Sequence, residues 1–351
     1  MKNRWIVVAL IIGSSVAALL LWKRESAEDA ERSDPPTLSQ RVNIGTEKLR
    51  AAATPTESKR ALSDVRAALR QMDTTEASDW ILAQWRTGED FATKLDLTLD
   101  SKQNLSGWPS WRAFLLDMLF LIDPETAAGI SSDLLQTSQS PDEWAIAMRN
   151  LGRLGRQEEL LKAKAAELLQ RKDWQENPST GYLEAFDVIV HTRSTELAPV
   201  LLNNCDLGDK KAVRHASFLT LDRLLIAAPN EVLPELAKQA SQHPQSGLML
   251  SNMIARADVR DEVQRQAVET YLLAPQRTAE ELRGFASVFP NANFHISNNL
   301  LTNSNTIPGK ELRNRDIAAL EATTQWLADP RFSAVHHVLR ESQKRLLQFL
   351  N

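Results

Sequence analysis

The residues of this chain that could bind a metal ion are scattered along the sequence. His336 and His337 are adjacent, so on a helix their side chains point about 100° apart, whereas two ligands on one helix lie three or four residues apart. The remaining histidines have no second histidine or cysteine at either spacing: His191, His215, His243 and His295. The sequence therefore predicts no metal ligands and no cofactor.

Nucleophilic and acid–base chemistry also lacks a recognisable motif. The single cysteine, Cys205, lies among leucines, which indicates a small core residue and no internal disulfide. Carboxylate pairs such as Asp258 and Glu262 are typical of solvated helix faces. Gly-x-Ser-x-Gly, Gly-x-x-x-x-Gly-Lys and Gly-x-Gly-x-x-Gly are all absent from the sequence. No catalytic residue is predicted, and we expect that the protein is not an enzyme.

The first 24 residues predict a membrane anchor. Residues 5–22 form an apolar run without a charged residue, long enough to cross a bilayer core of about 30 Å once as a helix. A tryptophan lies at each end of the run, and tryptophan favours the headgroup region of a bilayer. The predicted membrane-interface residues are Trp5, Trp22, Lys23 and Arg24.

Two uses of this apolar run are open. A cleavable secretory signal needs a small-x-small site, which Ser15 and Ala17 could supply. The run continues through residues 19–21, however, so we expect an uncleaved signal anchor. Basic residues on the two sides nearly balance, and the short N-terminal tail favours export of the large C-terminal part, with a cytoplasmic location left open. Gly13 and Ala17 form a small-xxx-small pair through which two anchors could dimerise.

Beyond the anchor the chain is acidic. Without the four basic residues of the first 24, the 41 Lys and Arg fall to 37 against 45 Asp and Glu, a formal charge of −8. Such a surface lacks the positive field that binding to a phosphate backbone requires, so nucleic acid is not an expected partner. Residues 25–36 are charged, small and proline-terminated without apolar periodicity, and they predict a flexible tether.

From residue 37 onward the pattern predicts an all-α fold. Apolar residues recur every three or four positions, and only 12 of 351 residues are glycine. Four capping boxes mark helix starts, at Thr37 with Gln40, Thr54 with Glu57, Ser140 with Glu143 and Thr278 with Glu281. The predicted helices span residues 37–53, 55–72, 75–87, 109–122, 124–137, 141–154, 156–171, 179–192, 195–204, 209–227, 229–242, 245–257, 259–273, 278–288, 292–302, 311–328 and 331–350.

Residues 93–100 break the helical pattern. Apolar and polar residues alternate there with the period of a β-strand. We expect an extended linker between the N-terminal helices and the rest of the chain; recruitment of a partner strand, or pairing between two copies, is the alternative. Four tryptophans flank this segment and are expected mostly in the core: Trp80, Trp85, Trp108 and Trp111.

Helix pairs opened by proline recur in the C-terminal part. The pair that begins near Pro124 is echoed by the pair that begins near Pro229, and pairs repeating about every 35 to 50 residues indicate an α-solenoid. With the blocks 212–219 and 262–268, these features make residues 109–349 resemble HEAT-like helical repeats. Tetratricopeptide-type repeats rank second, because their Trp-Leu-Gly-Tyr-Ala-Phe pattern is not apparent. The resemblance implies a right-handed α-solenoid of antiparallel helix pairs with a concave binding surface and no activity of its own.

The predicted domains are a signal anchor (1–24), a tether (25–36), an N-terminal helical segment with the extended stretch (37–108) and a HEAT-like repeat domain (109–351). The predicted function is a single-pass, membrane-anchored scaffold or adaptor in a bacterial cell envelope. It would bind protein partners on the concave side of helices 124–137, 156–171, 229–242 and 259–273. A tetratricopeptide-type envelope chaperone is one alternative. A cell-wall polymer hydrolase is the other, but it would need a compact catalytic domain of about 100 residues, for which no block remains.

Overall fold

A computed structural model describes residues 35–243, 246–293, 300–303 and 308–350 of the chain. These residues are almost entirely helical, which confirms the prediction of an all-α protein. The predicted membrane helix at 5–22, its interface residues, the pair Gly13 and Ala17, and most of the tether lie outside the described residues. Among the helices that are described, none is long and apolar enough to cross a membrane.

The N-terminal part contains helices followed by a short β hairpin. Its elements are α2 (Leu38–Ala51), α3 (Pro55–Leu69), α4 (Thr74–Arg86), β1 (Thr98–Leu99) and β2 (Leu105–Gly107). The middle part is made of α5 (Trp111–Ile122), α6 (Pro124–Thr137), α7 (Pro141–Arg153), α8 (Glu158–Gln170), α9 (Lys172–Glu176), α10 (Thr180–Glu184), α11 (Asp187–His191), η1 (Thr195–Leu197), α12 (Ala198–Cys205) and α13 (Lys211–Ala227). The C-terminal part follows with α14 (Pro229–Gln239), η2 (Ala240–Gln242), α15 (Gly247–Ile254), α16 (Glu262–Leu273), α17 (Ala279–Val288), α18 (Gly309–Ala328), η4 (Pro330–Val335) and α19 (His336–Leu350).

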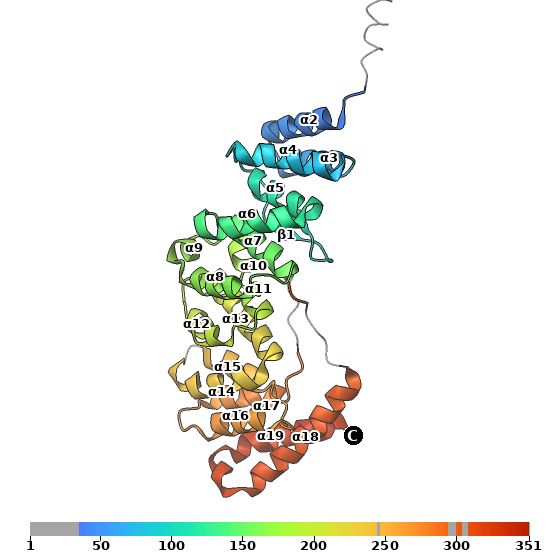
Figure 1. The fold of residues 1–351 in the computed structure, drawn as a ribbon. Coiled ribbons are helices and arrows are strands. Elements are labelled where there is room, and N and C mark those ends of the chain that lie inside the picture. Colours follow the sequence, from blue (N-terminus) through green and yellow to red (C-terminus); the bar gives the residue numbers. More distant parts are fainter. Residues whose placement is uncertain (1–34, 244–245, 294–299, 304–307, 351) are drawn as a thin grey trace, which may run out of the picture.

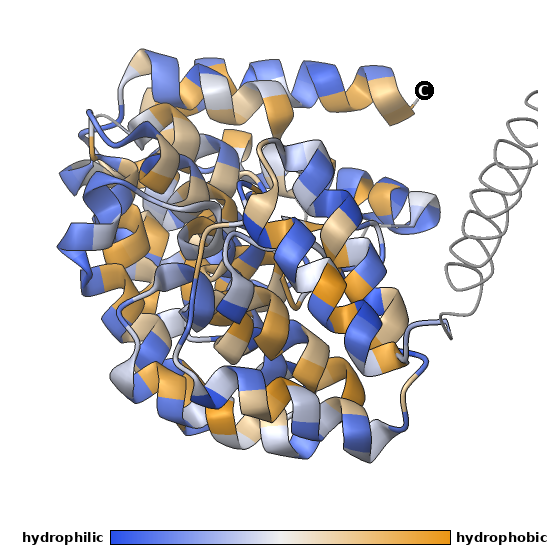
Figure 2. Cartoon of the chain, turned by 90° about the horizontal axis from the view of Figure 1, so that it is seen from above, coloured by the Kyte–Doolittle hydropathy of each residue, from blue (hydrophilic) through white to orange (hydrophobic). Residues whose placement is uncertain are grey.

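Helices that are neighbours in sequence pack against each other and against the next helix but one. α6 contacts both α5 and α7, α14 contacts α13 and α16, and α17 contacts α15 and α19. Figure 1 shows the result as a stack of helices that runs from α2 to the final pair, α18 and α19. Figure 2 shows both polar and apolar residues along the helices, as expected when one side of each helix faces a neighbour. The buried apolar residues form one cluster that extends from Val42 to Leu346.

The helix starts agree closely with the capping signals. Full capping boxes form at Thr37, Thr54 and Thr278. At Ser140 only half of the box forms: its hydroxyl accepts from the backbone N–H of Glu143, but the Glu143 carboxylate accepts from Arg112 at 2.6 Å and from a nearby serine hydroxyl instead. The ion pair between Arg112 and Glu143 thus replaces the contact of the Glu143 carboxylate with the Ser140 backbone N–H that a capping box predicts.

The segment predicted as an extended linker is part of a hairpin. Thr98 pairs with Gly107 and Leu99 with Leu105 in an antiparallel ladder. The strand therefore has a partner strand within its own chain. Of the flanking tryptophans, Trp108 and Trp111 are buried and the other two are half-buried, which confirms their mainly core position. Trp111 stacks on both Phe91 and Phe114, with ring centroids 5.7 and 5.5 Å apart, and the first contact joins the segment that precedes the hairpin to α5.

Two predicted helices are wrong in the structure. The helix at 179–192 is broken into α10 and α11, and the helix at 292–302 does not form at any of its described residues. Asparagine is frequent in the second segment, and its side chain competes for backbone groups: Asn291 donates to the carbonyl of Asn252 and accepts from the N–H of Asn293. Further along this segment, the backbone N–H groups of Leu301 and Thr302 donate to the carboxylate of Asp187 in α11 and not to carbonyl groups of a helix.

Candidate functional site

A short segment near the C-terminal end lies against helices from the middle of the chain. We call Leu300–Thr302 the brace. In sequence it lies between α17 and α18, yet it contacts Gly152 of α7, Asp187 of α11 and the tip of the β hairpin. Figure 1 shows it beside α11, away from the two helices that flank it in sequence. We call the site formed by α7, α11 and the hairpin tip the brace groove.

Asp187, the first residue of α11, is the centre of the brace groove. Its Oδ2 atom accepts from the backbone N–H groups of Leu301 at 2.6 Å and Thr302 at 2.9 Å. Its Oδ1 atom accepts from the hydroxyl of Thr302 at 2.7 Å and from Nη2 of Arg223 at 2.6 Å. The carboxylate is buried, and these charge-assisted bonds satisfy both of its oxygens. The groove thus recognises the brace through its main chain and one hydroxyl group.

The hairpin tip supplies a further contact. Nε2 of Gln103 donates to the carbonyl oxygen of Thr302 at 2.8 Å. Gln103 has a φ of 62°, and the Asp100 carboxylate closes the turn by accepting from the N–H of Asn104 at 2.9 Å. Arg153 of α7 donates to the carbonyl of Gln103 at 2.5 Å and holds the tip in place. The segment predicted as a linker therefore positions one side chain of the site.

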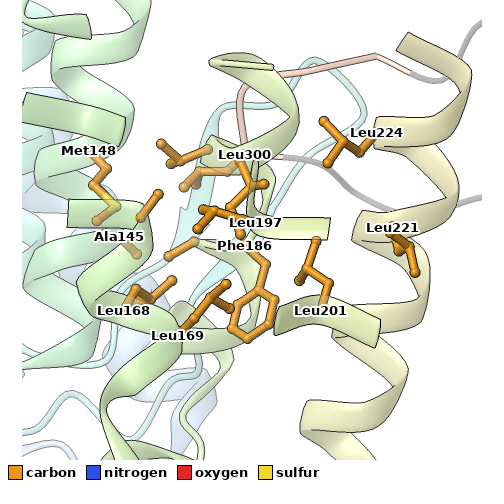
Figure 3. Packing of buried hydrophobic residues seen from close by; sticks show 14 of the residues in the cluster. Ala145, Met148, Leu168, Leu169, Phe186, Leu197, Leu201, Leu221, Leu224 and Leu300 are labelled. Atoms are coloured by element: carbon orange, nitrogen blue, oxygen red, sulfur yellow. The ribbon is translucent and has the colours of Figure 1, made fainter. Parts of the chain in front are cut away.

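The leucines of the brace fill the apolar part of the groove. Leu300 is fully buried, and Figure 3 shows it with Phe186, Leu197 and other apolar side chains of the core. Leu301 lies so close to α7 that a Cβ at Gly152 would be 2.6 Å from its Cδ1 atom. A larger residue at position 152 would force the end of the Leu301 side chain to move away from α7. Burial of one leucine contributes about 1.5 to 3 kcal/mol.

A cavity of about 150 Å³ continues the groove beyond Leu301. It is lined by Gly152, Gly155, Arg156, Glu158, Leu161, His191, Thr192 and Arg193. Arg156 pairs with Glu125, and Glu158 pairs with Lys162 at 2.8 Å, so much of the charge at the rim is already neutralised. An open volume therefore borders the part of the brace groove beside Gly152.

Buried Asp–Arg pairs connect helices with the next helix but one, or with the residues just after it. Their members are Asp117 with Arg149 (3.0 Å), Asp187 with Arg223 (2.6 Å) and Asp222 with Arg256 (2.5 Å), separated by 32, 36 and 34 residues. Each aspartate sits in an apolar stretch of its helix, where an unpaired charge would be very costly. An aspartate within an apolar stretch of a helix is a signal that could have identified Asp187 from the sequence. The sequence analysis did not predict Asp187 as a site residue.

Glu184 is a titratable group close to this centre. Burial and, to a lesser extent, the neighbouring Asp187 carboxylate raise the pKa of Glu184 to about 7, while the Arg223 guanidinium opposes the shift. The native state therefore holds a proton on Glu184 that the unfolded chain releases near its ordinary pKa of about 4.3. The stability that this proton gives to the native state is therefore lost as the pH rises from the ordinary pKa of about 4.3 to the native pKa of about 7.

Replacing Glu184 with glutamine should therefore stabilise the protein at pH 8 and have little effect near pH 4. The expected gain at pH 8 is roughly 1 to 3 kcal/mol in the free energy of unfolding, measured by urea titration at both pH values. Glu159→Gln, at an exposed surface position, is the control and should change stability by less than about 0.5 kcal/mol at either pH. A gain for Glu184→Gln that does not depend on pH would contradict this assignment.

The histidines do not come together as a ligand set. His336 and His337 open α19, His215 lies on α13, His191 lines the cavity, and His295 lies outside the described residues. In the part of the chain that the structure describes, no group of three His, Cys, Asp or Glu side chains could hold a metal ion. Cys205 is buried, and burial raises the pKa of its thiol to about 12, as expected for a core residue.

His243, Asp206 and Ser246 lie together but do not form a nucleophile and base. The His243 ring bonds the Asp206 carboxylate at 2.6 Å, and the Ser246 hydroxyl donates to the same carboxylate. A catalytic serine must donate to the histidine instead, so that the ring can take its proton. The Asp206 carboxylate instead ties His243 and Ser246 to the end of α12.

Comparison with known proteins adds no assignment. No family model, no curated protein and no solved structure matches this chain.

Proposed function

We propose that this protein is a membrane-tethered helical-repeat scaffold that binds a short non-helical segment of a partner protein. The observation that supports this most directly is the brace groove, where Asp187 and Gln103 bind the main chain of a short bent segment. Recognition through backbone N–H and carbonyl groups accepts many sequences, and buried side-chain pockets beside it add selectivity. A groove built in this way is suited to binding peptide segments of other proteins.

The helical arrangement fits the same function. Helices that contact mainly their neighbours in sequence give the extended stack of Figure 1, which is the architecture expected of the right-handed, HEAT-like α-solenoid that we propose. Such stacks offer long surfaces to partners. The brace lies against α7 and α11. Neither helix is among the four that the sequence predicted as the binding face. The proposed site is therefore on the helices that follow 124–137 and 156–171, and not on those helices themselves.

The location follows from the N-terminal sequence. We propose that residues 5–22 anchor the chain in a membrane, with Trp5 and Trp22 at its two interfaces, and that the acidic remainder is exported. A tetratricopeptide-type envelope chaperone or assembly factor would keep the same anchor and share the peptide-binding role.

Photo-crosslinking in cells tests this proposal. A benzophenone amino acid in place of Arg193, which lines the cavity beside the groove and is exposed, should form an adduct with a partner protein of defined mass. The matched control is the same substitution at exposed Glu231 of α14, which should give no adduct. Adducts at position 231 alone would favour the face predicted from sequence, and their absence at both positions would count against a scaffold.

A further inference from the structure

We propose that the brace groove binds a partner segment that carries two leucines followed by threonine or serine, and that the brace occupies this site in cis until the partner displaces it. This inference rests on the proposed scaffold function and names the chemistry of the partner. The brace itself, Leu-Leu-Thr, shows which segment the groove accepts.

The main-chain contacts exclude proline from two positions. The backbone N–H groups of Leu301 and Thr302 both donate to Oδ2 of Asp187, and proline has no N–H to donate. The carbonyl of Thr302 accepts from Gln103, which sets the direction of the segment in the groove. A partner must therefore present two successive N–H groups to one carboxylate oxygen, followed by a carbonyl group, with the same bent backbone.

The side-chain contacts select the residue types. The Leu300 position is enclosed by apolar side chains, so it requires a large apolar residue. The Thr302 position requires a hydrogen-bond donor, because the Asp187 carboxylate only accepts and Oδ1 already faces the hydroxyl at 2.7 Å. Serine meets this requirement and valine does not. Phosphorylation at this position would bring a dianion against the Asp187 carboxylate and should block binding.

The brace is held in a way that permits exchange. Of its three side chains only Leu300 is fully buried, while Leu301 and Thr302 are half-buried. Its described contacts with Asp187, Gln103 and Gly152 are all local to the groove, so it can leave while the helices remain packed. A segment attached in cis competes at an effective concentration in the millimolar range, which lowers the apparent affinity of any partner.

A peptide-binding experiment with the full chain in detergent tests this inference. The probe is a fluorescein-labelled peptide with the sequence of residues 298–304, Asn-Asn-Leu-Leu-Thr-Asn-Ser, followed by fluorescence anisotropy. The variant Leu300→Ala with Thr302→Val weakens the brace and leaves the groove intact, so it should bind the peptide at least tenfold more tightly than the wild type. The single change Thr302→Val, which preserves side-chain shape, should give a smaller gain.

Matched controls separate groove binding from loss of fold. Adding Gln103→Asn to the double variant shortens the side chain that donates to the Thr302 carbonyl and keeps a residue type that tolerates the φ of 62°, so it should remove much of the gain. A phosphothreonine version of the peptide should not bind. The double variant should still unfold cooperatively, at a lower melting temperature than the wild type because Leu300→Ala removes buried apolar surface, and should still bind the peptide. A large fall in melting temperature without peptide binding would show that the brace only stabilises the fold, and would overturn the inference.

The crosslinking experiment distinguishes this inference from the proposed function. If the partner adduct at position 193 rises several-fold in the brace variant, displacement of the brace by the partner is supported. If the adduct forms equally in wild type and variant, the scaffold function stands and control by the brace is wrong. If the peptide binds but no adduct forms in either protein, the inferred sequence preference of the groove is supported and the proposed scaffold function is wrong.

Discussion

Replacing Arg149 with alanine is expected to lower the free energy of unfolding by about 3 to 5 kcal/mol, because it leaves the buried Asp117 carboxylate without its cation. Both side chains are almost fully buried, and the carboxylate also accepts from Nε1 of Trp108 at 3.0 Å. Burial raises the pKa of Asp117, and the loss of Arg149 would raise it further. Chemical denaturation followed by circular dichroism measures the change.

Two further variants show whether the buried charge is the cause. Arg156→Ala removes an exposed partner of Glu125 and should change stability by about 1 kcal/mol or less. Arg149→Met combined with Asp117→Leu removes both charges and should recover much of the stability lost in Arg149→Ala. If the double variant is as unstable as the single one, packing of the arginine stem and not the unpaired carboxylate would explain the loss.

Removing the final helix pair is expected to have the largest effect on stability. A chain that ends after Pro308 lacks α18, η4 and α19, whose Trp326 and Phe332 are fully buried in an aromatic cluster with Phe289. Loss of one such aromatic side chain alone costs about 3 to 5 kcal/mol, so loss of the pair should expose the apolar side of α17 and cause aggregation.

Size-exclusion chromatography with light scattering measures this effect. The control is Phe349→Ala in the full chain, since Phe349 is 67% exposed and its loss should change stability by about 0.5 kcal/mol or less. A truncated chain that remains monomeric and melts cooperatively would show that α18 and α19 do not cap the stack.

Local signals in the sequence predicted most of the helices correctly. The capping boxes at Thr37, Thr54 and Thr278 begin helices where expected, because a cap is formed by residues three apart in the chain. Pro124 and Pro229 stand at the first turn of their helices for the same local reason, since a missing N–H costs nothing there. The burial of Cys205 also followed from its apolar neighbours in the sequence.

These local signals did not predict the candidate site. The apolar spacing of residues 292–302 is compatible with a helix, but the N–H groups of Leu301 and Thr302 bind Asp187, which lies more than 110 residues earlier in the sequence. Gln103 reaches the same segment across 199 residues. The sequence by itself determined where helices start and which faces are apolar, because those depend on neighbours along the chain. Only the tertiary structure decided which buried carboxylate receives the brace, because hydrogen bonds between distant segments depend on how the helices stack.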